Sequence, residues 1–459
     1  MGPDPHARPL DQLIRAYGMG ALSTAPQTLL NPRLPRAALD RLTFRRIRAI
    51  IRHAIEHVPF YRDHLAAAGI RPDDIAGPAE LARVPLLTKP LLRENSHRML
   101  ADNAPPREEL LERSSSGSSG SPVSLLFDPL RELPRRIQEL RLLTAHGFRP
   151  WHVQLVFDHP GHMAPGKFFP QRLGLWRREV FPCWLPIEDA LALIRELQPD
   201  ILHGVLSSLR MLSLAVKARQ PLPYRPKLIV SKGELLDPGT RALIEGTLGA
   251  KQADYYATEE TGIIAWECPS GSGYHIDQDF VHVETVRADG TLTEPGEPGE
   301  IVLTNLYMRA MPFIRYRVGD LGTLSPDPCP CGRSLPVLKN LIGRRLDLIV
   351  TPSGEIHQPF ALMVAMEGVP EVRRYRLQQK AVDLILAEVC WESGLGDDAK
   401  RAARGRIVAA MHERLGEAVR IDVQEVADFE HGLGEKFPLV RGLGQSVDQL
   451  SSTRYHFRF

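Results

Sequence analysis

Between residues 130 and 250 the chain alternates short apolar runs with helix-like segments, and this alternation limits the possible folds more than any other feature. The runs HVQLVFD, DILHGV and PKLIVSKGE have the length and apolar character of buried strands. The segments IEDALALIRELQ, LSSLRMLSLAVKA and PGTRALIEGTLG repeat apolar residues at helical spacing. Successive strand–helix units predict a mainly parallel sheet.

The sequence changes character after residue 274. YHIDQDFVHVETV, GEIVLTNL and PFIRYRVGDLGTL alternate apolar and polar residues, which is typical of antiparallel strands. Further on, two strand-like segments flank the amphipathic DDAKRAARGRIVAAMHERLG, which indicates a small α+β unit. We therefore expect an α/β fold with two domains. The large N-terminal domain, residues 1–345, would hold mixed parallel sheets and a small antiparallel sheet or barrel, and residues 346–459 would form a small C-terminal α+β domain.

Charge and hydropathy narrow the range of partners. The net charge of +2 gives no reason to expect nucleic acid. No stretch is apolar for the ~18 residues that a membrane helix needs, and the start lacks the features of a signal peptide. We therefore expect a cytoplasmic protein with no membrane partner. The Arg-rich segment LRELPRRIQELR has the pattern of an ordinary charged helix face.

The stretch ERSSSGSSGSPVSLLFD, from Glu112 to Asp128, contains seven serines and two glycines. Such a loop can turn backbone N–H groups and hydroxyls toward an anion such as phosphate. It is not a Walker A loop, because no Lys-Ser/Thr pair follows the second glycine. Composition alone leaves a flexible linker equally open.

Acidic residues follow two of the expected strands. Glu259 and Glu260, in ADYYATEETG, lie at the carboxyl end of a strand, where α/β sheets bind ligands. A carboxylate there can hold Mg²⁺, and an adjacent tyrosine can stack on a base. Asp320, in FIRYRVGDLG, can accept hydrogen bonds from ribose hydroxyls. Taken singly, a solvated acidic loop and a β-turn aspartate are the alternatives.

Taken in order, these segments resemble one family. SSGSSGSP, SKGELL, YYATEETG, IRYRVGDLG, GRRLDLIVTPSG and LGEKFPLVR are similar to motifs of the adenylate-forming acyl-CoA ligase superfamily. Within it, the chain resembles the phenylacetate–CoA ligase branch, which includes coenzyme F390 synthetase-like and CapK-like members. The resemblance runs from about residue 40 to 441.

The resemblance implies an AMP-forming acid–thiol ligase. Such an enzyme joins an aryl or arylacetic acid to ATP as an acyl-AMP, then transfers the acyl group to coenzyme A. Three alternatives remain open: transfer to a carrier-protein thiol or an amine, transfer of AMP to a cofactor hydroxyl, and a non-catalytic binding protein. Lys436 and Glu259 are both present, which argues against the last.

The resemblance also implies roles for single residues. Lys436, which alone would be taken for a surface charge, would reach the carboxylate and α-phosphate from a small mobile domain. Glu259 would hold Mg²⁺, and Thr258 would bond phosphate. The implied ATP site also contains Ser115, Ser116, Gly117, Ser118, Ser119 and Gly120 around the phosphates, Gly233, Glu234, Tyr255 and Tyr256 near adenine, and Asp320 and Arg344 near the ribose. The implied acyl pocket contains His203, Tyr256 and Ala257.

Three positions depart from the family pattern. Ser121 stands where many members have lysine, so the loop lacks one cation. Tyr256 stands where glycine is usual and would reshape the acyl pocket. Leu346 replaces the first of two acidic hinge residues and leaves Asp347 alone. None of these changes removes the residues with implied catalytic roles, so we expect an active enzyme.

A second site is indicated by cysteines. Cys268 and His275 form one short cluster, and Cys329 and Cys331 form another. Four such ligands suit tetrahedral zinc, and similar clusters occur in the F390 synthetase-like branch. Free cysteines beside a turn are the alternative. Other residues carry weaker expectations: a buried Cys183 and Cys390, and His159 and His162 beside a substrate entrance. A homodimer is left open.

Overall fold

The computed structural model describes most of the chain. The described residues are 28–114, 124–128, 131–158, 173–182, 185–218, 221–344, 348–357, 362–363, 365–366, 368–427, 429 and 440–443. The chain divides into two compact units. The first contains residues 1–318 and 322–341, and the second contains residues 319–321 and 342–459.

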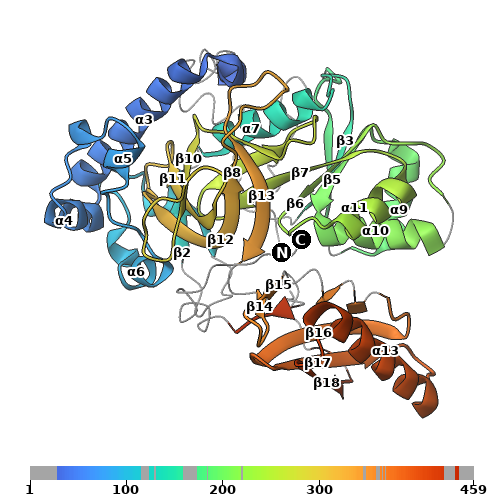
Figure 1. Ribbon diagram of the computed structural model, residues 1–459. Coiled ribbons are helices and arrows are strands. Elements are labelled where there is room, and N and C mark those ends of the chain that lie inside the picture. Colours follow the sequence, from blue (N-terminus) through green and yellow to red (C-terminus); the bar gives the residue numbers. More distant parts are fainter. Residues whose placement is uncertain are drawn as a thin grey trace. The chain divides into compact units, whose positions relative to one another are not determined.

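The first unit is built on a mixed sheet (Figure 1). Within the described residues this sheet has 11 strands in the order β10-β11-β12-β13-β9-β8-β7-β6-β5-β3-β4. The strands are β3 (Gln154–Asp158), β4 (Arg178–Pro182), β5 (Ile201–Val205), β6 (Leu228–Lys232), β7 (Gln252–Thr258), β8 (Gly262–Glu267), β9 (Tyr274–Ile276), β10 (Val281–Val286), β11 (Pro298–Asn305), β12 (Tyr316–Leu324) and β13 (Val337–Arg344).

The sheet has a parallel and an antiparallel half, as the sequence predicts. Strands β3 to β7 pair in parallel. From β7 onward, β7–β8, β8–β9, β9–β13 and β10–β11 pair antiparallel. The predicted α/β class is therefore confirmed, since short, mostly buried strands separated by helices form the parallel half and alternating strands form the other.

Helices cover both faces of the parallel half. Helices α9 (Ile187–Leu197), α10 (Leu206–Ala218) and α11 (Pro238–Leu248) pack on one face, where Ile194, Leu209 and Ile244 share a core with Leu155, Leu202 and Ile229. Helix α7 (Glu132–Ala145) packs on the other face, where Leu142 and Leu143 share a core with Ile201, Val230 and Ala253. Neighbouring strand residues thus point to opposite layers, as a pleated strand requires.

The N-terminal helices pack on the antiparallel half. Helix α3 (Arg36–His57) ends just before Pro59, which begins α4 (Pro59–Ala67), because proline is tolerated in the first turn of a helix but not in its interior. Helices α5 (Pro78–Leu81) and α6 (Lys89–Glu94) follow. Ile47, Ile51 and Leu65 share a core with Phe313 and Tyr316. Strands β1 (Leu111–Ser114) and β2 (Ser124–Phe127) form a separate antiparallel pair.

The second unit is a small α+β structure, as predicted. Its sheet has the order β18-β17-β16-β19. The strands are β16 (Val372–Ala381), β17 (Leu384–Trp391), β18 (Arg420–Glu425) and β19 (Val440–Arg441), and β14 (Ile349–Val350) pairs separately with β15 (Ile356–His357). Helix α13 (Asp397–Leu415) covers this sheet, with Ile407 and Met411 buried against Leu377 and Ile385. Among the described residues, no helix is both long and apolar enough to cross a membrane.

Candidate active site

Hydrogen bonds of Thr258 and Thr261 hold the turn after β7 in place, and the Glu259 carboxylate takes no part in them. The hydroxyls of Thr258 and Thr261 lie 2.8 Å apart. The Thr261 carbonyl accepts from the Asn305 amide at 3.0 Å and from the Tyr307 hydroxyl at 3.2 Å. Gly262 has φ +76°, and a Cβ there would lie 2.9 Å from the Tyr307 oxygen. Glycine is therefore required at 262, and the turn presents Glu259 from a fixed backbone.

Glu259 faces an arginine that the sequence did not single out. Nη2 of Arg131 lies 3.6 Å from Oε1 of Glu259, whose side chain is 38% exposed. The Arg131 guanidinium lies over the Phe127 ring, 3.8 Å from its centroid, and its Nη1 makes no hydrogen bond to a described residue. Burial lowers the pKa of Arg131, although Glu132 and Glu259 oppose the shift. A partly exposed carboxylate at this strand end is suited to bind Mg²⁺.

Tyr255 and Tyr256 point to opposite faces of β7. The Tyr255 hydroxyl lies 3.3 Å from Nε2 of His203, and the two rings meet edge to face. Burial raises the pKa of Tyr255 above its ordinary value. Tyr256 instead packs with Ile264 and Ala265 on the other side. His203, which the sequence predicts as a substrate residue, therefore contacts Tyr255 and lies on the opposite side of β7 from Tyr256. The third predicted substrate residue, Ala257, is half-buried.

Gly233 and Glu234 follow the carboxyl end of β6. Gly233 has φ +84°, a conformation that favours glycine. The Glu234 carboxylate accepts from the Ser207 backbone N–H at 3.0 Å and from the Ser207 hydroxyl at 2.9 Å. Ser207 lies in the first turn of α10, where a carboxylate stabilises the exposed N–H groups. Glu234 therefore ties the end of one strand to the start of a helix.

The remaining predicted nucleotide residues are described only in part. Asp320 lies on β12, half-buried, directly after Gly319 with φ +86°. Arg344 is the last residue of β13, and its side chain lies outside the described residues. The following predicted positions also lie outside them: the loop residues Ser115–Gly120 and Ser121, His159, His162, Cys183, Leu346, Asp347 and Lys436. Their roles stay predictions.

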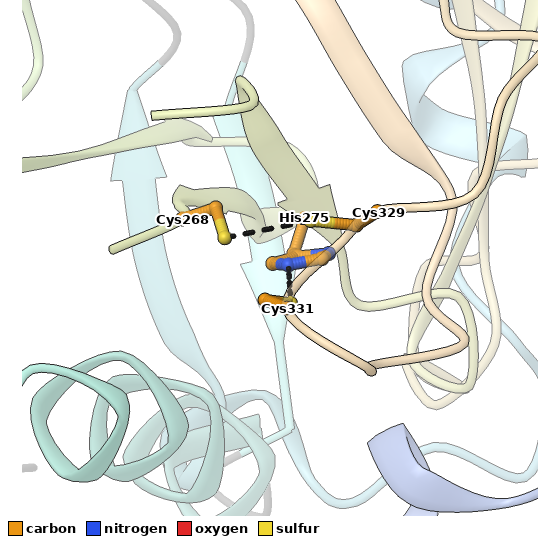
Figure 2. Close-up of side chains that lie close together, drawn as sticks. All are labelled: Cys268, His275, Cys329 and Cys331. Carbon is orange, nitrogen blue, oxygen red and sulfur yellow. Dashed lines mark hydrogen bonds between the residues drawn. The ribbon is translucent and has the colours of Figure 1, made fainter. Parts of the chain in front are cut away.

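The four predicted metal ligands come together (Figure 2). Cys268 follows β8, His275 lies on β9, and Cys329 and Cys331 lie in the connection between β12 and β13. Sγ of Cys268 lies 3.6 Å from Sγ of Cys329, and Nε2 of His275 lies 3.1 Å from Sγ of Cys331. All four ligand atoms lie within 4.8 Å of one another. Zn–S bonds of about 2.3 Å would place two tetrahedral sulfur ligands roughly 3.8 Å apart, so this donor set fits zinc.

The protonation of this cluster is also compatible with a metal. Burial, helped by Arg333, lowers the pKa of His275 to about 4, so its ring is neutral at pH 7. Burial opposes ionisation of Cys329, but hydrogen bonds led by the Cys331 backbone N–H lower its pKa to about 7. The described cysteines Cys268, Cys329, Cys331 and Cys390 are all free thiols, and Cys390 is buried as predicted.

Curated relatives decide the family. A phenylacetate-coenzyme A ligase of Thermus thermophilus is 29% identical over 360 residues, covering 74% of this chain and 77% of the relative. A phenylacetate-coenzyme A ligase of Aromatoleum evansii is 30% identical over 329 residues, covering 68% of this chain and 72% of the relative. The chain belongs to the phenylacetate–CoA ligase family. The resemblance expected from the motifs is confirmed, and the chain is an acid–thiol ligase of the adenylate-forming class.

Solved structures agree on the fold of this phenylacetate–CoA ligase family member. A 2-hydroxyisobutyryl-CoA ligase in its postadenylation state, in complex with 2-HIB-AMP, has a TM-score of 0.72 and 22% sequence identity. The match covers 93% of this chain and 94% of that one. No model of a known protein family matches the chain.

Proposed function

We propose that the chain activates an aryl or arylacetic acid with ATP as an acyl-AMP and then transfers the acyl group to the thiol of coenzyme A. The family membership supports this reaction, and the structural observation that carries it is the placement of Glu259. Its carboxylate lies at the carboxyl end of β7, on a turn fixed by Thr258, Thr261 and Gly262. Ligands of α/β sheets bind at such strand ends.

The chemistry asks for charge neutralisation and alignment rather than covalent catalysis. The acid's carboxylate oxygen attacks the α-phosphorus, the P–O bond to pyrophosphate breaks, and the thiol later displaces AMP from the acyl carbon. Glu259 would hold Mg²⁺, which when bound neutralises phosphate charge. Arg131, 3.6 Å from Glu259, adds a fixed positive charge beside it. Tyr255, Gly233 and Asp320 would surround the nucleoside.

The resemblance to the family implies a separate role for each of the two domains. We propose that residues 1–345 bind ATP and the acid and that residues 346–459 form a lid carrying Lys436. The lid would bring its ammonium group to the carboxylate and α-phosphate for the first half-reaction and withdraw for the second. Ser115–Gly120 would donate hydrogen bonds to the phosphates.

An acid-dependent release of pyrophosphate tests this function. The protein is mixed with ATP, Mg²⁺ and a panel of aryl and arylacetic acids, with and without coenzyme A. We expect pyrophosphate with some acids and a thioester only when coenzyme A is present. Pyrophosphate without a thioester would favour a carrier-protein or amine acceptor. Release of pyrophosphate from no acid would favour a binding protein or AMP transfer to a cofactor hydroxyl.

We further propose that Cys268, His275, Cys329 and Cys331 bind a structural zinc ion. The support is the closeness of four soft or borderline donors from three separate segments. Zinc would supply no chemistry to the ligation and would fasten the β8–β9 turn to the β12–β13 connection. Thiol ligation of this kind suits the reducing cytoplasm, where ATP and coenzyme A are also found. A homodimer stays a prediction.

A further inference from the structure

The inner face of α7 is charged along its first half. Glu132, Arg135, Arg136 and Glu139 follow the spacing of one helix face, and Leu142 and Leu143 continue that face in the apolar core. The expectation that this Arg-rich segment forms an ordinary charged face is therefore wrong, because its charges lie where a helix normally places core residues. Glu139 keeps only 7% of its surface exposed.

The strands opposite present a matching layer of polar side chains. The register pairs Val156 with His203, His203 with Val230, and Lys232 with Tyr255. Since side chains alternate along a strand, Asp158, His203, Lys232 and Tyr255 all point toward the α7 layer. The layers meet: Nδ1 of His203 lies 3.4 Å from Oε1 of Glu139, and Nη1 of Arg178 lies 3.5 Å from its Oε2.

The charges in this layer do not balance. Among the described residues it holds the cations Arg135, Arg136, Arg178 and Lys232 against the carboxylates Glu132, Glu139 and Asp158. His203 adds no charge, because burial lowers its pKa in spite of Glu139. One positive charge is therefore in excess. Burying charges costs free energy that an apolar core would not, so the fold alone gives no reason for this layer.

Arg135 and Arg178 are the two cations of this layer whose nearest carboxylates are farthest away, at 3.5 Å each. The ion pair of Arg135 is with Glu132, and Glu132 also faces Arg131 at 3.7 Å. Arg136 and Lys232, in contrast, have carboxylates at 2.9 and 2.7 Å. The Arg135 side chain remains 21% exposed. Nearby, Nε of Arg178 and Nη1 of buried Arg131 make no hydrogen bond to a described residue.

We propose that Arg135, assisted by Arg178, binds a second carboxylate of the acid substrate, so that this ligase acts on aryl dicarboxylic acids. The inference rests on the proposed function. Arg131 marks the reacting end through Glu259, and Arg135 follows four residues later, about 6 Å further along the helix. This rise is comparable with the separation of two carboxylates placed para on a benzene ring. A guanidinium binds a carboxylate through two parallel hydrogen bonds.

Matched acids test the proposal. Pyrophosphate release and calorimetric binding are measured with 4-carboxyphenylacetate, with its uncharged 4-carboxamide and with phenylacetate. We expect the dicarboxylate to be preferred in kcat/KM by roughly 10- to 100-fold over both monocarboxylates, as charge-assisted hydrogen bonds allow. An equal or better response to either monocarboxylate would overturn the proposal, including a preference for the carboxamide.

Variants locate the effect and separate it from the proposed function. Arg135→Gln should remove most of the preference, and Arg135→Lys should keep part of it. Arg287→Gln, which breaks an exposed ion pair with Glu297, should leave the preference unchanged. Arg135-dependent binding without pyrophosphate from any acid would contradict the proposed function alone. A preference that survives in a folded Arg135→Gln protein would contradict the inference alone.

Discussion

Glu259 combines a rigid backbone with a carboxylate that can exchange partners. Its ion pair with Arg131 at 3.6 Å is longer than a charge-assisted hydrogen bond. The side chain is partly exposed, whereas Arg131 is 8% exposed and stacked on Phe127. A cation arriving with ATP can therefore bind Glu259 without unfolding the turn, while Arg131 stays in place.

Replacing Glu259 should slow adenylation specifically. We expect Glu259→Gln to lower the single-turnover rate of pyrophosphate formation by about 10²–10³-fold, because one electrostatic stabiliser is lost. The midpoint of thermal unfolding should change little, since the side chain is partly exposed. The neighbouring Glu260→Gln is the control, because Glu260 accepts a hydrogen bond from the Tyr316 hydroxyl at 3.0 Å. A larger rate loss in the control would contradict the assignment.

Asp254 should make stability depend on pH. Burial raises its pKa from 3.8 to about 7, although hydrogen bonds from Ser231 and Tyr274 oppose the shift. Between pH 4 and 7 the folded state therefore holds a proton that the unfolded state has released. The unfolding free energy should therefore fall by up to about 1.4 kcal/mol for each unit by which the pH rises from 4 to 7. Above pH 7 Asp254 should cause no further decrease.

Denaturant unfolding from pH 4 to 8 measures this slope. The variant Asp254→Asn keeps the shape but cannot ionise, so its stability should fall less steeply over this interval than that of the parent. Parallel pH profiles for the two proteins would show that Asp254 is not the group responsible.

At the scale of elements, the sequence predicts that α7 is a helix but does not predict which of its faces is buried. Its helical spacing predicts the helix, but spacing alone does not say which face is covered. Charged residues usually face solvent, so Arg135 and Glu139 suggested an exposed face. The register of β3, β5 and β6 decides otherwise, because it places Asp158, His203 and Lys232 beneath the helix. Only pairing between distant strands carries this information.

The Cys/His cluster, in contrast, was recognisable before the structure. Two short clusters with ligand-type residues predict a shared site, and the pairing of β9 with β13 brings them together. We expect about one zinc ion per chain by metal analysis of the purified protein. Cys329→Ser should release the metal and lower the thermal midpoint, and Cys390→Ser, outside the cluster, should not release it. Full occupancy with unchanged stability in Cys329→Ser would exclude the proposed ligand set.

At the scale of the whole molecule, the sequence predicts the family because the family's motifs occur in order along one chain. Each motif alone is compatible with an ordinary loop, turn or surface charge. In combination, Glu259 after a strand, Asp320 on a later strand and Lys436 near the end of the chain indicate one family. The strand–helix alternation predicted the parallel half for a physical reason, since strands buried on both faces must be short and apolar. The sequence does not predict the identity of the acyl substrate, because the side chains that contact it are far apart in the sequence.

The proposed lid predicts that Lys436 serves only the first half-reaction. Lys436→Ala should lower acyl-AMP formation by at least about 10²-fold, because a positive charge is lost from the transition state. Thioester formation from supplied acyl-AMP and coenzyme A should remain within a few-fold of the parent rate. Both rates are measured in single-turnover experiments on the full chain, and equal losses in both would contradict the lid assignment.

The central claim is that the acid's own oxygen attacks the α-phosphorus, and isotope transfer tests this most directly. The reaction is run with an acid labelled with ¹⁸O in its carboxylate, together with ATP, Mg²⁺ and coenzyme A. Mass spectrometry should find one labelled oxygen in the AMP that is released. Label in inorganic phosphate together with ADP, or AMP without label, would contradict the claim.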